Sequence, residues 1–313
     1  MVRVACDLCG EQTARPCLTP ATGIPGLQTT FSIVQCAACG LLYTCPRPAQ
    51  ACMPRLYSSY YTTQADPLPV SARQTSSLRQ RLRPLWHRYC GQYLTEVIGK
   101  ARGAVLEIGC GTGDLLEELA ARGCRVHGVD INPVSVRACR QKGLPATVGE
   151  LDDLVFPADS FDTVILWHVV EHLPSPRAAL EKIRRLLRPG GRLFLYCPNA
   201  GSYLASLFGA CWYAWQLPFH FYHFTPATMR RLAQQAGFSV VRLRTITPEY
   251  LVAYSLDLWG RSSKRRMVAT FLRSGLHRTL LFRLAISPLF RLLDWWRRGQ
   301  GECLQVELMK PEA

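Results

Sequence analysis

The chain has 313 residues, of which 48% are apolar and 19% are charged. This composition excludes a wholly disordered protein, because it supplies enough apolar side chains for a substantial core. The length suits one large domain with an appendage, or two modest domains. The formal net charge is +15, and the excess of Lys and Arg lies in residues 1–100 and 201–313, whereas residues 101–200 are neutral. Basic flanks favour an anionic partner, although arginines spread over the surface of a soluble enzyme give the same count.

The opening residues, 1–7, lack the continuous apolar core of a secretory signal. The chain also contains 14 cysteines. In a reducing compartment, pairs of cysteines bind metals more often than they bind each other. We therefore expect a cytoplasmic protein, with membrane association left open.

Residues 1–45 are rich in Cys, Pro and Gly and show no sustained periodicity, which indicates a small module that lacks an apolar core of its own. Two Cys-x-x-Cys-Gly segments lie in it, one with Cys6 and Cys9 and the other with Cys36 and Cys39. Four thiolates fill the tetrahedral shell of Zn²⁺ and leave no position for water, so the ion would be structural. The sequence predicts a zinc ribbon, with a longer loop than usual between the two pairs.

Residues 46–99 are predicted to be a helical connector or cap, and residues 100–313 the main domain. In the main domain, short apolar runs alternate with helical patterns. We predict strands over 104–108, 125–130, 161–167, 192–197, 238–244 and 301–308. We predict helices over 114–122, 134–142, 177–187 and 225–236. This alternation indicates an α/β fold in which helices cover both faces of a parallel sheet, closed by an antiparallel last strand beside 238–244.

Two segments fit this scheme less well. Residues 200–224 are aromatic and carry no charge if His is neutral, but Gly, Pro and His interrupt them, so we predict an apolar lid and not a membrane span. Residues 248–300 are predicted to be a basic helical insertion. Its amphipathic pattern suits either a helix at a membrane surface or a helix packed on its own domain with its arginines in water. The segments 200–224 and 250–300 are therefore the two candidate surfaces for peripheral membrane contact.

A glycine-rich loop follows the first strand of the main domain, in Glu107–Gly113 (EIGCGTG). Such a loop between a strand and a helix allows a ligand to approach the backbone closely. The G-x-G-x-G spacing differs from the G-x-G-x-x-G of dinucleotide-binding loops. Glu107 and Asp114 would repel a pyrophosphate, and Glu107 suits an ammonium group. The loop therefore predicts a nucleoside ligand with a cationic tail.

The second strand ends at Asp130, seventeen residues after Gly113. A carboxylate at this position can accept hydrogen bonds from both hydroxyls of a ribose. A glycine loop alone is often only a tight turn. The combination with Glu107 and Asp130 on consecutive strands favours a nucleoside site.

These motifs resemble those of class I S-adenosylmethionine-dependent methyltransferases over about residues 100–247 and again at the last strand. The resemblance is carried by 105–113, 128–130, 156–162, 171–173 and 188–191. Within that superfamily the chain is similar to the branch that contains ubiquinone-pathway O-methyltransferases and bacterial natural-product and glycan methyltransferases. The resemblance implies a Rossmann-like sheet and an S-adenosylmethionine cofactor.

The resemblance also implies roles for individual residues. Glu107 would position the amino-acid end of the cofactor, and Asp130 would hold its ribose. Backbone room would come from Gly109, Gly111 and Gly113.

At the adenine end, Ile131 would lie against the base, and Glu150 with the Leu151 N–H would address its amino group. Trp167 and His168 would border the sulfonium.

Three polar residues follow the strand predicted over 161–167. They are His168, Glu171 and His172, which are spaced i, i+3 and i+4 and would share one helical face. We place the candidate catalytic residues here, His168 and His172. They could supply a general base, which the transfer needs only if the acceptor must lose a proton. They could also bind a divalent ion, as in some ubiquinone-pathway relatives, or His172 could simply cap a turn before Pro174. His220 and His223 resemble a family segment that lies over the acceptor pocket, although aromatic packing would explain them equally well.

The sequence thus predicts a methyltransferase that carries out O- or C-methylation of a small-molecule, sugar-bearing or lipid-like acceptor. Two alternatives remain. The basic flanks and the zinc ribbon would also suit an RNA methyltransferase. No Pro-Pro-Tyr motif follows the strand predicted over 161–167, so a nucleic-acid partner is the less favoured choice. The other alternative is a non-catalytic scaffold that binds a partner or a membrane through a vestigial cofactor fold.

Overall fold

The computed structural model describes residues 1–20, 30–53, 56, 94–262, 275 and 279–312. The predicted connector, 46–99, lies largely outside the described residues. Its described parts are a short 3-10 turn at Gln50–Cys52 and the helix α3 (Leu94–Lys100).

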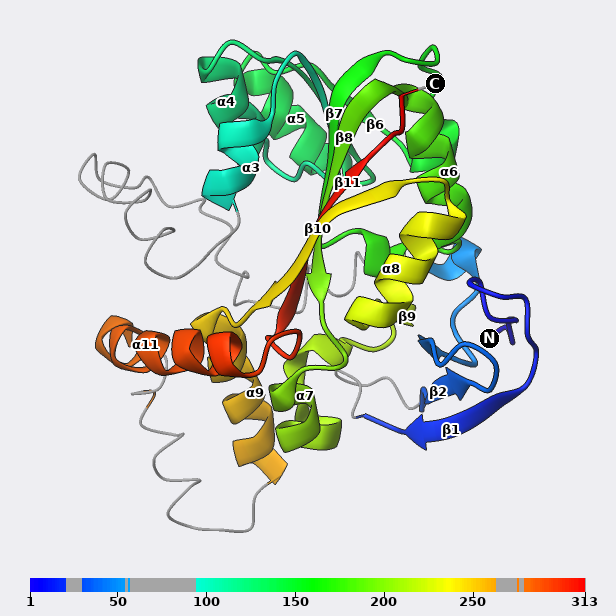
Figure 1. Cartoon of the computed structure of the whole chain (residues 1–313), viewed down its shortest axis with the longest axis vertical. Coiled ribbons are helices and arrows are strands. Elements are labelled where there is room, and N and C mark those ends of the chain that lie inside the picture. Colours follow the sequence, from blue (N-terminus) through cyan, green and yellow to red (C-terminus); the bar gives the residue numbers. More distant parts are fainter. Residues whose placement is uncertain (21–29, 54–55, 57–93, 263–274, 276–278, 313) are drawn as a thin grey trace.

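A seven-stranded sheet forms the centre of the molecule, in the order β10-β11-β8-β7-β4-β5-β6 (Figure 1). Its strands are β4 (Ala104–Ile108), β5 (Arg125–Asp130), β6 (Ala146–Val148), β7 (Phe161–Trp167), β8 (Leu187–Pro198), β10 (Ser239–Ile246) and β11 (Cys303–Met309). The five strands from β6 to β8 are parallel, and β11 is antiparallel to both β8 and β10. The predicted α/β sheet and its antiparallel last strand are confirmed.

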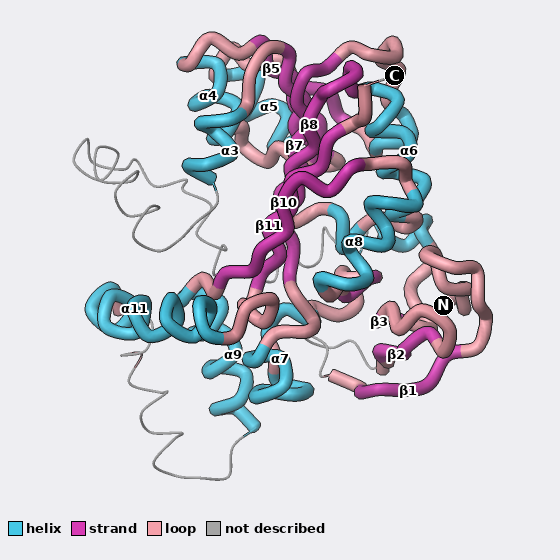
Figure 2. Tube along the Cα trace, viewed as in Figure 1, coloured by secondary structure: helices cyan, strands magenta, loops and turns pink. Residues whose placement is uncertain are grey.

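Helices cover both faces of the sheet (Figure 2). On one side lie α3, α4 (Asp114–Ala121) and α5 (Pro133–Gln141); on the other lie α6 (Pro176–Leu186) and α8 (Pro226–Gln235). Local sequence explains their starts. The Asn132 side chain caps α5 by accepting a hydrogen bond from the Val134 N–H, and the Thr225 side chain caps α8 by accepting one from the Thr228 N–H. Both helices have Pro as their first residue. The central strand β4 is buried along its whole length, as expected for a parallel strand covered on both faces.

The structure differs from the predicted boundaries at two places. The strand predicted over 192–197 begins earlier, at Leu187, directly after α6. The intervening Pro-Gly-Gly turn is accommodated as a bulge in the pairing with β7, and Gly190 and Gly191 exchange hydrogen bonds with Lys310 at the end of β11. The strand β6 was not predicted, because three residues are too short to show an alternating pattern.

A second, four-stranded sheet contains β1 (Ala14–Leu18), β2 (Ile33–Cys36), β3 (Leu42–Thr44) and β9 (Tyr222–His223). The first three strands belong to the cysteine-containing module, which comprises residues 1–45, and β9 comes from the predicted lid. In the antiparallel pairing, Leu42 lies opposite His223 and Tyr43 opposite Tyr222. The lid and the module are therefore joined by backbone hydrogen bonds.

The lid begins with α7 (Tyr203–Phe208), and the predicted insertion contains α9 (Glu249–Ser262) and α11 (Leu280–Trp296). In Figure 1 these three helices lie together at one end of the central sheet. Trp212 and Trp215 of the lid are buried, in a small core that also includes Phe290 of α11. Within the described part of the chain, no helix has both the length and the apolar character that crossing a bilayer requires.

Candidate functional site

The glycine-rich loop lies at the carboxyl edge of the parallel sheet, between β4 and α4. Gly109 has a φ of 74°, and a Cβ there would lie 2.4 Å from Cγ2 of Val169. Gly111 has a φ of 51°, and a Cβ there would meet nothing within 4 Å. Gly109 is thus required by backbone conformation and by contact with Val169, whereas the space at Gly111 is open to a ligand.

Glu107 is buried at the end of β4, and its Oε2 atom has no hydrogen-bond partner among the described residues. Burial raises the pKa of this carboxyl well above its usual value, and the nearby charges of Asp130 and Asp114 raise it further. A buried carboxylate oxygen without a partner calls for an explanation. The ammonium group of an amino-acid ligand would supply both a donor and a compensating charge.

Asp130 lies across the loop from Glu107, at the end of β5. Its Oδ2 accepts a hydrogen bond of 2.9 Å from the Gly111 N–H, and its Oδ1 accepts one of 2.8 Å from the Asn132 N–H. Burial raises the pKa of Asp130, and these two bonds oppose that rise. Each carboxylate oxygen keeps a second lone pair for a ribose hydroxyl. The neighbouring Ile131 is 51% exposed, so an apolar surface is available to a base.

The predicted adenine-end residues Glu150 and Leu151 follow β6. Leu151 is buried, and Glu150 is exposed. The Glu150 carboxylate accepts hydrogen bonds from Gln50 Nε2 at 3.1 and 3.2 Å. Glu150 precedes the 3-10 turn Leu151–Asp153, and its backbone N–H donates to Asp153 Oδ2 at 3.0 Å. Contact with an adenine amino group would compete with Gln50, a partner 100 positions earlier that no sequence pattern indicated.

Trp167 and His168 follow at the end of β7. The Trp167 ring stacks on Tyr196 of β8 with ring centroids 4.2 Å apart. His168 has a left-handed backbone with a φ of 55°, which its N–H bond of 2.8 Å to the Tyr196 carbonyl holds in place. Its Nδ1 lies 3.1 Å from Oε1 of the buried Glu171. Because Val169 contacts the glycine-rich loop at Gly109, this pair lies beside that loop.

His172 and His220 lie on the other side of Glu171. Their Nδ1 atoms are 3.0 Å from the Phe219 carbonyl and 2.8 Å from the Ala214 carbonyl. A carbonyl only accepts, so each Nδ1 carries the proton and each Nε2 a lone pair. Burial lowers the pKa of both rings.

Glu171, His172 and His220 each offer one ligand atom, and these atoms lie within 4.8 Å of one another. Two neutral imidazoles and a carboxylate form a donor set suited to a divalent transition metal. The structure thus groups Glu171 and His172 with His220, whereas the sequence suggested a trio with His168.

The four predicted zinc ligands come together at the tips of two matching turns. Their Sγ atoms lie within 4.8 Å of one another, with 3.4 Å between Cys6 and Cys39 and 3.5 Å between Cys9 and Cys36. All four are free thiols. In each turn the glycine N–H donates a hydrogen bond to the carbonyl of the first cysteine, Gly10 to Cys6 and Gly40 to Cys36. The arrangement could hold one tetrahedral metal ion.

Contacts between the cysteine module and the rest of the site were missed by sequence reasoning. Asp7 caps α6, because its carboxylate accepts from Ser175 Oγ at 2.6 Å and from the Arg177 N–H at 2.8 Å. Thr44 donates to the His220 carbonyl at 2.7 Å. Arg47 donates to the Tyr222 hydroxyl at 3.1 Å. The partners lie more than a hundred positions apart, and no local signal could have predicted these contacts.

Comparison with known proteins agrees with this geometry. Residues 78–243 match the family described as "Methyltransferase domain". The ubiquinone biosynthesis O-methyltransferase of Cupriavidus pinatubonensis is 30% identical over 168 residues, covering 50% of this chain and 68% of that protein. The protein with the same name from Xanthomonas oryzae is 33% identical over 141 residues, covering 42% of this chain and 59% of that protein.

Solved structures give only distant likenesses. An S-adenosylmethionine-dependent methyltransferase from Mesorhizobium loti has a TM-score of 0.48 at 16% identity and covers 71% of this chain and 99% of its own. One from Archaeoglobus fulgidus has a TM-score of 0.47 at 20% identity and covers 74% of this chain and 98% of its own. The strand order defines the fold more firmly than these scores do.

The chain belongs to the methyltransferase domain family. Its strand order, glycine loop and acidic residue at the end of β5 are those of a class I S-adenosylmethionine-dependent methyltransferase. The acceptor is not defined by this assignment.

Proposed function

We propose that the protein transfers the methyl group of S-adenosylmethionine to a hydroxyl of a small-molecule, sugar-bearing or lipid-like acceptor. The observation that carries this proposal is the contact of 3.1 Å between His168 and the buried Glu171, beside the cofactor loop. The name of the relatives, ubiquinone biosynthesis O-methyltransferase, supports oxygen as the methylated atom. C-methylation remains the second choice.

The residues around the loop fit S-adenosylmethionine. Glu107 would hold its ammonium group, Asp130 its ribose hydroxyls, and Ile131 one face of its adenine. When bound, the cofactor supplies a methyl group that is already activated on a sulfonium. The protein therefore has to align the acceptor, exclude water and accept a proton.

In our proposal His168 is the general base. The Nδ1–H of His168 donates a hydrogen bond to the Glu171 carboxylate, which leaves the lone pair on Nε2. The side chain of His168 is 29% exposed, whereas that of Glu171 is 1% exposed. Nε2 can take the proton that an acceptor hydroxyl must lose, and the carboxylate then stabilises the imidazolium.

Replacement of His168 by Gln tests this role. We expect kcat to fall by roughly 10²–10⁴-fold, while the affinity for S-adenosylmethionine, measured by calorimetry, stays within about twofold, because His168 is not among the proposed cofactor ligands. His127→Gln is a matched control, since His127 lies on β5 and bonds to Thr147 away from the loop. An unchanged kcat in His168→Gln would exclude His168 as the base.

The acceptor class can be found by incubating the protein and labelled S-adenosylmethionine with a host extract that is then separated into lipid, glycan, small-molecule, RNA and protein fractions. Label in the lipid, glycan or small-molecule fraction supports the proposal. Label only in RNA or protein would overturn the acceptor class. A protein that does not bind the cofactor in calorimetry would instead be a non-catalytic scaffold.

We also propose that Cys6, Cys9, Cys36 and Cys39 hold a structural Zn²⁺. A tetrahedral ion with Zn–S bonds of about 2.3 Å places its sulfurs roughly 3.8 Å apart, and the contacts of 3.4 and 3.5 Å are near that value. Four protein ligands leave no position for a substrate, so the ion would act on folding. Elemental analysis of carefully purified protein should find stoichiometric zinc, and less than half an equivalent would count against the site.

A further inference from the structure

An apolar stripe runs along the outer face of α11. Leu289, Leu292, Trp295 and Trp296 are 53%, 59%, 66% and 70% exposed. Their spacing of three and four residues places them on one face of the helix. Single exposed apolar residues are common, but a contiguous row of large ones marks an interaction surface.

The opposite face of α11 is held firmly by the domain. Phe290 is buried, and its ring stacks with that of Tyr203 in α7. Asp294 accepts hydrogen bonds of 2.7 Å from both the N–H and the hydroxyl of Thr247. These contacts fix the rotation of the helix about its own axis, so the stripe points away from the core.

Positive charge borders the stripe. Arg291, Arg297 and Arg298 are exposed, and the Arg297 guanidinium lies 5.5 Å from the centre of the Trp296 ring. Asp294 is the one acidic residue in the α11 sequence, and it faces Thr247. Trp beside Arg, with Leu between, is the composition of helices that lie in the interface of an anionic bilayer.

The stripe lies at the same edge of the sheet as the proposed acceptor site. After Trp296 the chain enters β11, whose first residue, Cys303, pairs with Pro198 at the carboxyl end of β8. His168 follows the carboxyl end of the adjacent strand, β7. In Figure 1, α7 and α9 lie beside α11, and they expose Leu207 and Trp259.

We propose that the outer face of α11 binds anionic phospholipid membranes, with Leu289, Leu292, Trp295 and Trp296 inserted among the acyl chains and Arg297 and Arg298 at the headgroups. Binding would present the acceptor edge of the sheet to the bilayer. The membrane binding does not depend on methyl transfer. Its corollary, that the acceptor is carried by a lipid, rests on the proposed function.

Co-sedimentation of the full chain with vesicles tests the proposal. The wild type should bind vesicles that contain phosphatidylglycerol and bind vesicles of pure phosphatidylcholine much more weakly. Trp295→Ser/Trp296→Ser should lower the affinity about tenfold or more, because affinity follows the apolar area inserted. Arg297→Gln and Arg298→Gln should each lower binding to phosphatidylglycerol by about fivefold, the equivalent of about 1 kcal/mol per charge.

Val155→Ser/Val241→Ser is the matched control, since both valines are exposed, at 95% and 47%, and lie outside α11. It should bind as the wild type does. Circular dichroism and calorimetry with S-adenosylmethionine show whether each variant is folded. A wild type that binds neither vesicle, or a tryptophan variant that binds unchanged, overturns the proposal. A dimer that the tryptophan substitutions dissociate would identify the stripe as a contact between copies and would also overturn it.

Discussion

His168 combines features that are uncommon in a residue with a purely structural role. A non-glycine residue with a φ of 55° is strained. The strain is held by a backbone bond to Tyr196 and by the ring contact with Glu171. Release of this conformation would move the ring away from Glu171. Strain that is retained beside a cofactor loop supports a role in positioning an acceptor or a proton.

Asp130 allows a sharp test of the cofactor site. Asp130→Asn keeps the shape of the side chain but replaces one carboxylate oxygen by an NH₂ group. This group cannot accept a hydrogen bond, so the amide loses one of the two backbone bonds from Gly111 and Asn132 and one site for a ribose hydroxyl. We expect the affinity for S-adenosylmethionine to fall by about 1–3 kcal/mol in calorimetry.

Asp159→Asn is the control for that substitution. Asp159 is an exposed acid with a φ of 56°, a conformation that Asn tolerates, and it pairs with Lys310 outside the cofactor loop. Its affinity should match that of the wild type. An unchanged affinity in Asp130→Asn would remove Asp130 from the site.

Among the elements, β9 connects the cysteine module to the acceptor side. It pairs with β3, and the next residues of the chain lead into α8. A metal ion in the module would therefore stabilise the segment that carries His220 and His223. The same segment contains Phe219, whose carbonyl accepts the hydrogen bond that orients His172.

If the four cysteines hold zinc as proposed, loss of one of them should affect the proposed acceptor side more than the proposed cofactor side. In Cys9→Ser we expect lost zinc, faster hydrogen exchange in β3 and β9, and a raised KM for the acceptor, with affinity for S-adenosylmethionine within about threefold. Cys17→Ser, at an exposed free thiol in β1, should behave as the wild type. Equal loss of both affinities in Cys9→Ser would mean that the module supports the whole fold and not the acceptor side.

Glu302 joins the lid to the last strand and should make stability depend on pH. It is fully buried, and it accepts from the Trp212 indole N–H and from Ser202 Oγ. Burial raises the pKa of Glu302 to about 7. Between pH 4.5 and 7 the native state therefore binds more protons than the unfolded state, and the free energy of unfolding falls as the pH rises through this window.

Glu302→Gln removes this titration. Urea unfolding should show that, between pH 4.5 and 8, the free energy of unfolding of the wild type falls by about 3 kcal/mol relative to that of Glu302→Gln. This value is the pKa shift multiplied by about 1.36 kcal/mol per pKa unit. Glu117→Gln, at an exposed site, provides the comparison for a solvated acid. A constant difference across the pH range would contradict the pKa assigned to Glu302.

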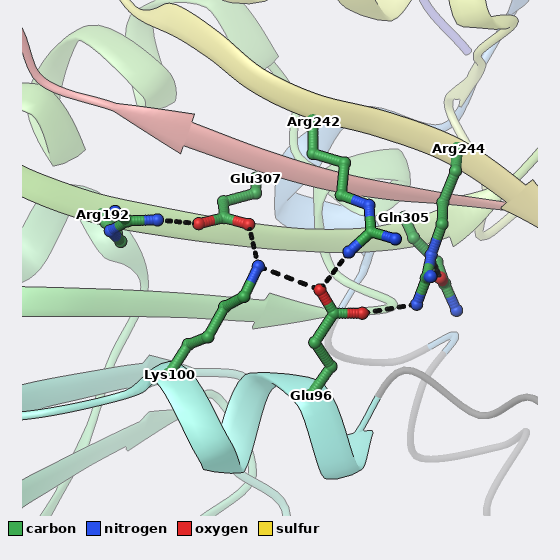
Figure 3. A network of polar contacts seen from close by, with 7 residues as sticks. All are labelled: Glu96, Lys100, Arg192, Arg242, Arg244, Gln305 and Glu307. Carbon is green, nitrogen blue, oxygen red and sulfur yellow. Dashed lines mark hydrogen bonds and ion pairs between the residues drawn. The ribbon is translucent and has the colours of Figure 1, made fainter. Parts of the chain in front are cut away.

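At the scale of the whole molecule, a network of charges fastens α3 to the antiparallel edge of the sheet (Figure 3). Glu307 of β11 is buried and pairs with Lys100 at 2.6 Å and with Arg192. Glu96 pairs with Lys100 at 2.9 Å, with Arg244 at 2.5 Å and with Arg242. One helix is thus joined to the three strands β8, β10 and β11.

Glu307→Gln should lower the free energy of unfolding by about 2 kcal/mol, measured by urea unfolding. The variant leaves two cations without their buried partner, but both are about one-third exposed, so water compensates part of the loss. Glu118→Gln breaks an exposed pair with Arg122 and should change stability by less than about 0.5 kcal/mol. If Glu307→Gln lowered the free energy of unfolding by only as much as Glu118→Gln does, the network would contribute little to stability.

The positions of the glycine loop and of the acid at the end of β5 could be predicted because their signals are local. The glycine spacing after Glu107, and an acid at the end of the next strand, need only a few consecutive residues to be recognised. The two Cys-x-x-Cys-Gly turns are equally local, and the structure brings them together. The short strand β6 and the Gln50–Glu150 contact had no such signal.

The sequence by itself determined the alternation of strands and helices, the glycine loop and the two Cys-x-x-Cys-Gly turns, since each depends on backbone conformation or on residue type within a short segment. Only the tertiary structure decided which apolar residues are covered. The aromatic segments 200–224 and 250–300 looked alike as candidate membrane surfaces, yet Trp212 and Trp215 are buried, whereas Trp295 and Trp296 are exposed. Periodicity shows that a helix has an apolar face, but burial depends on what packs against that face, and the partners lie far away along the chain.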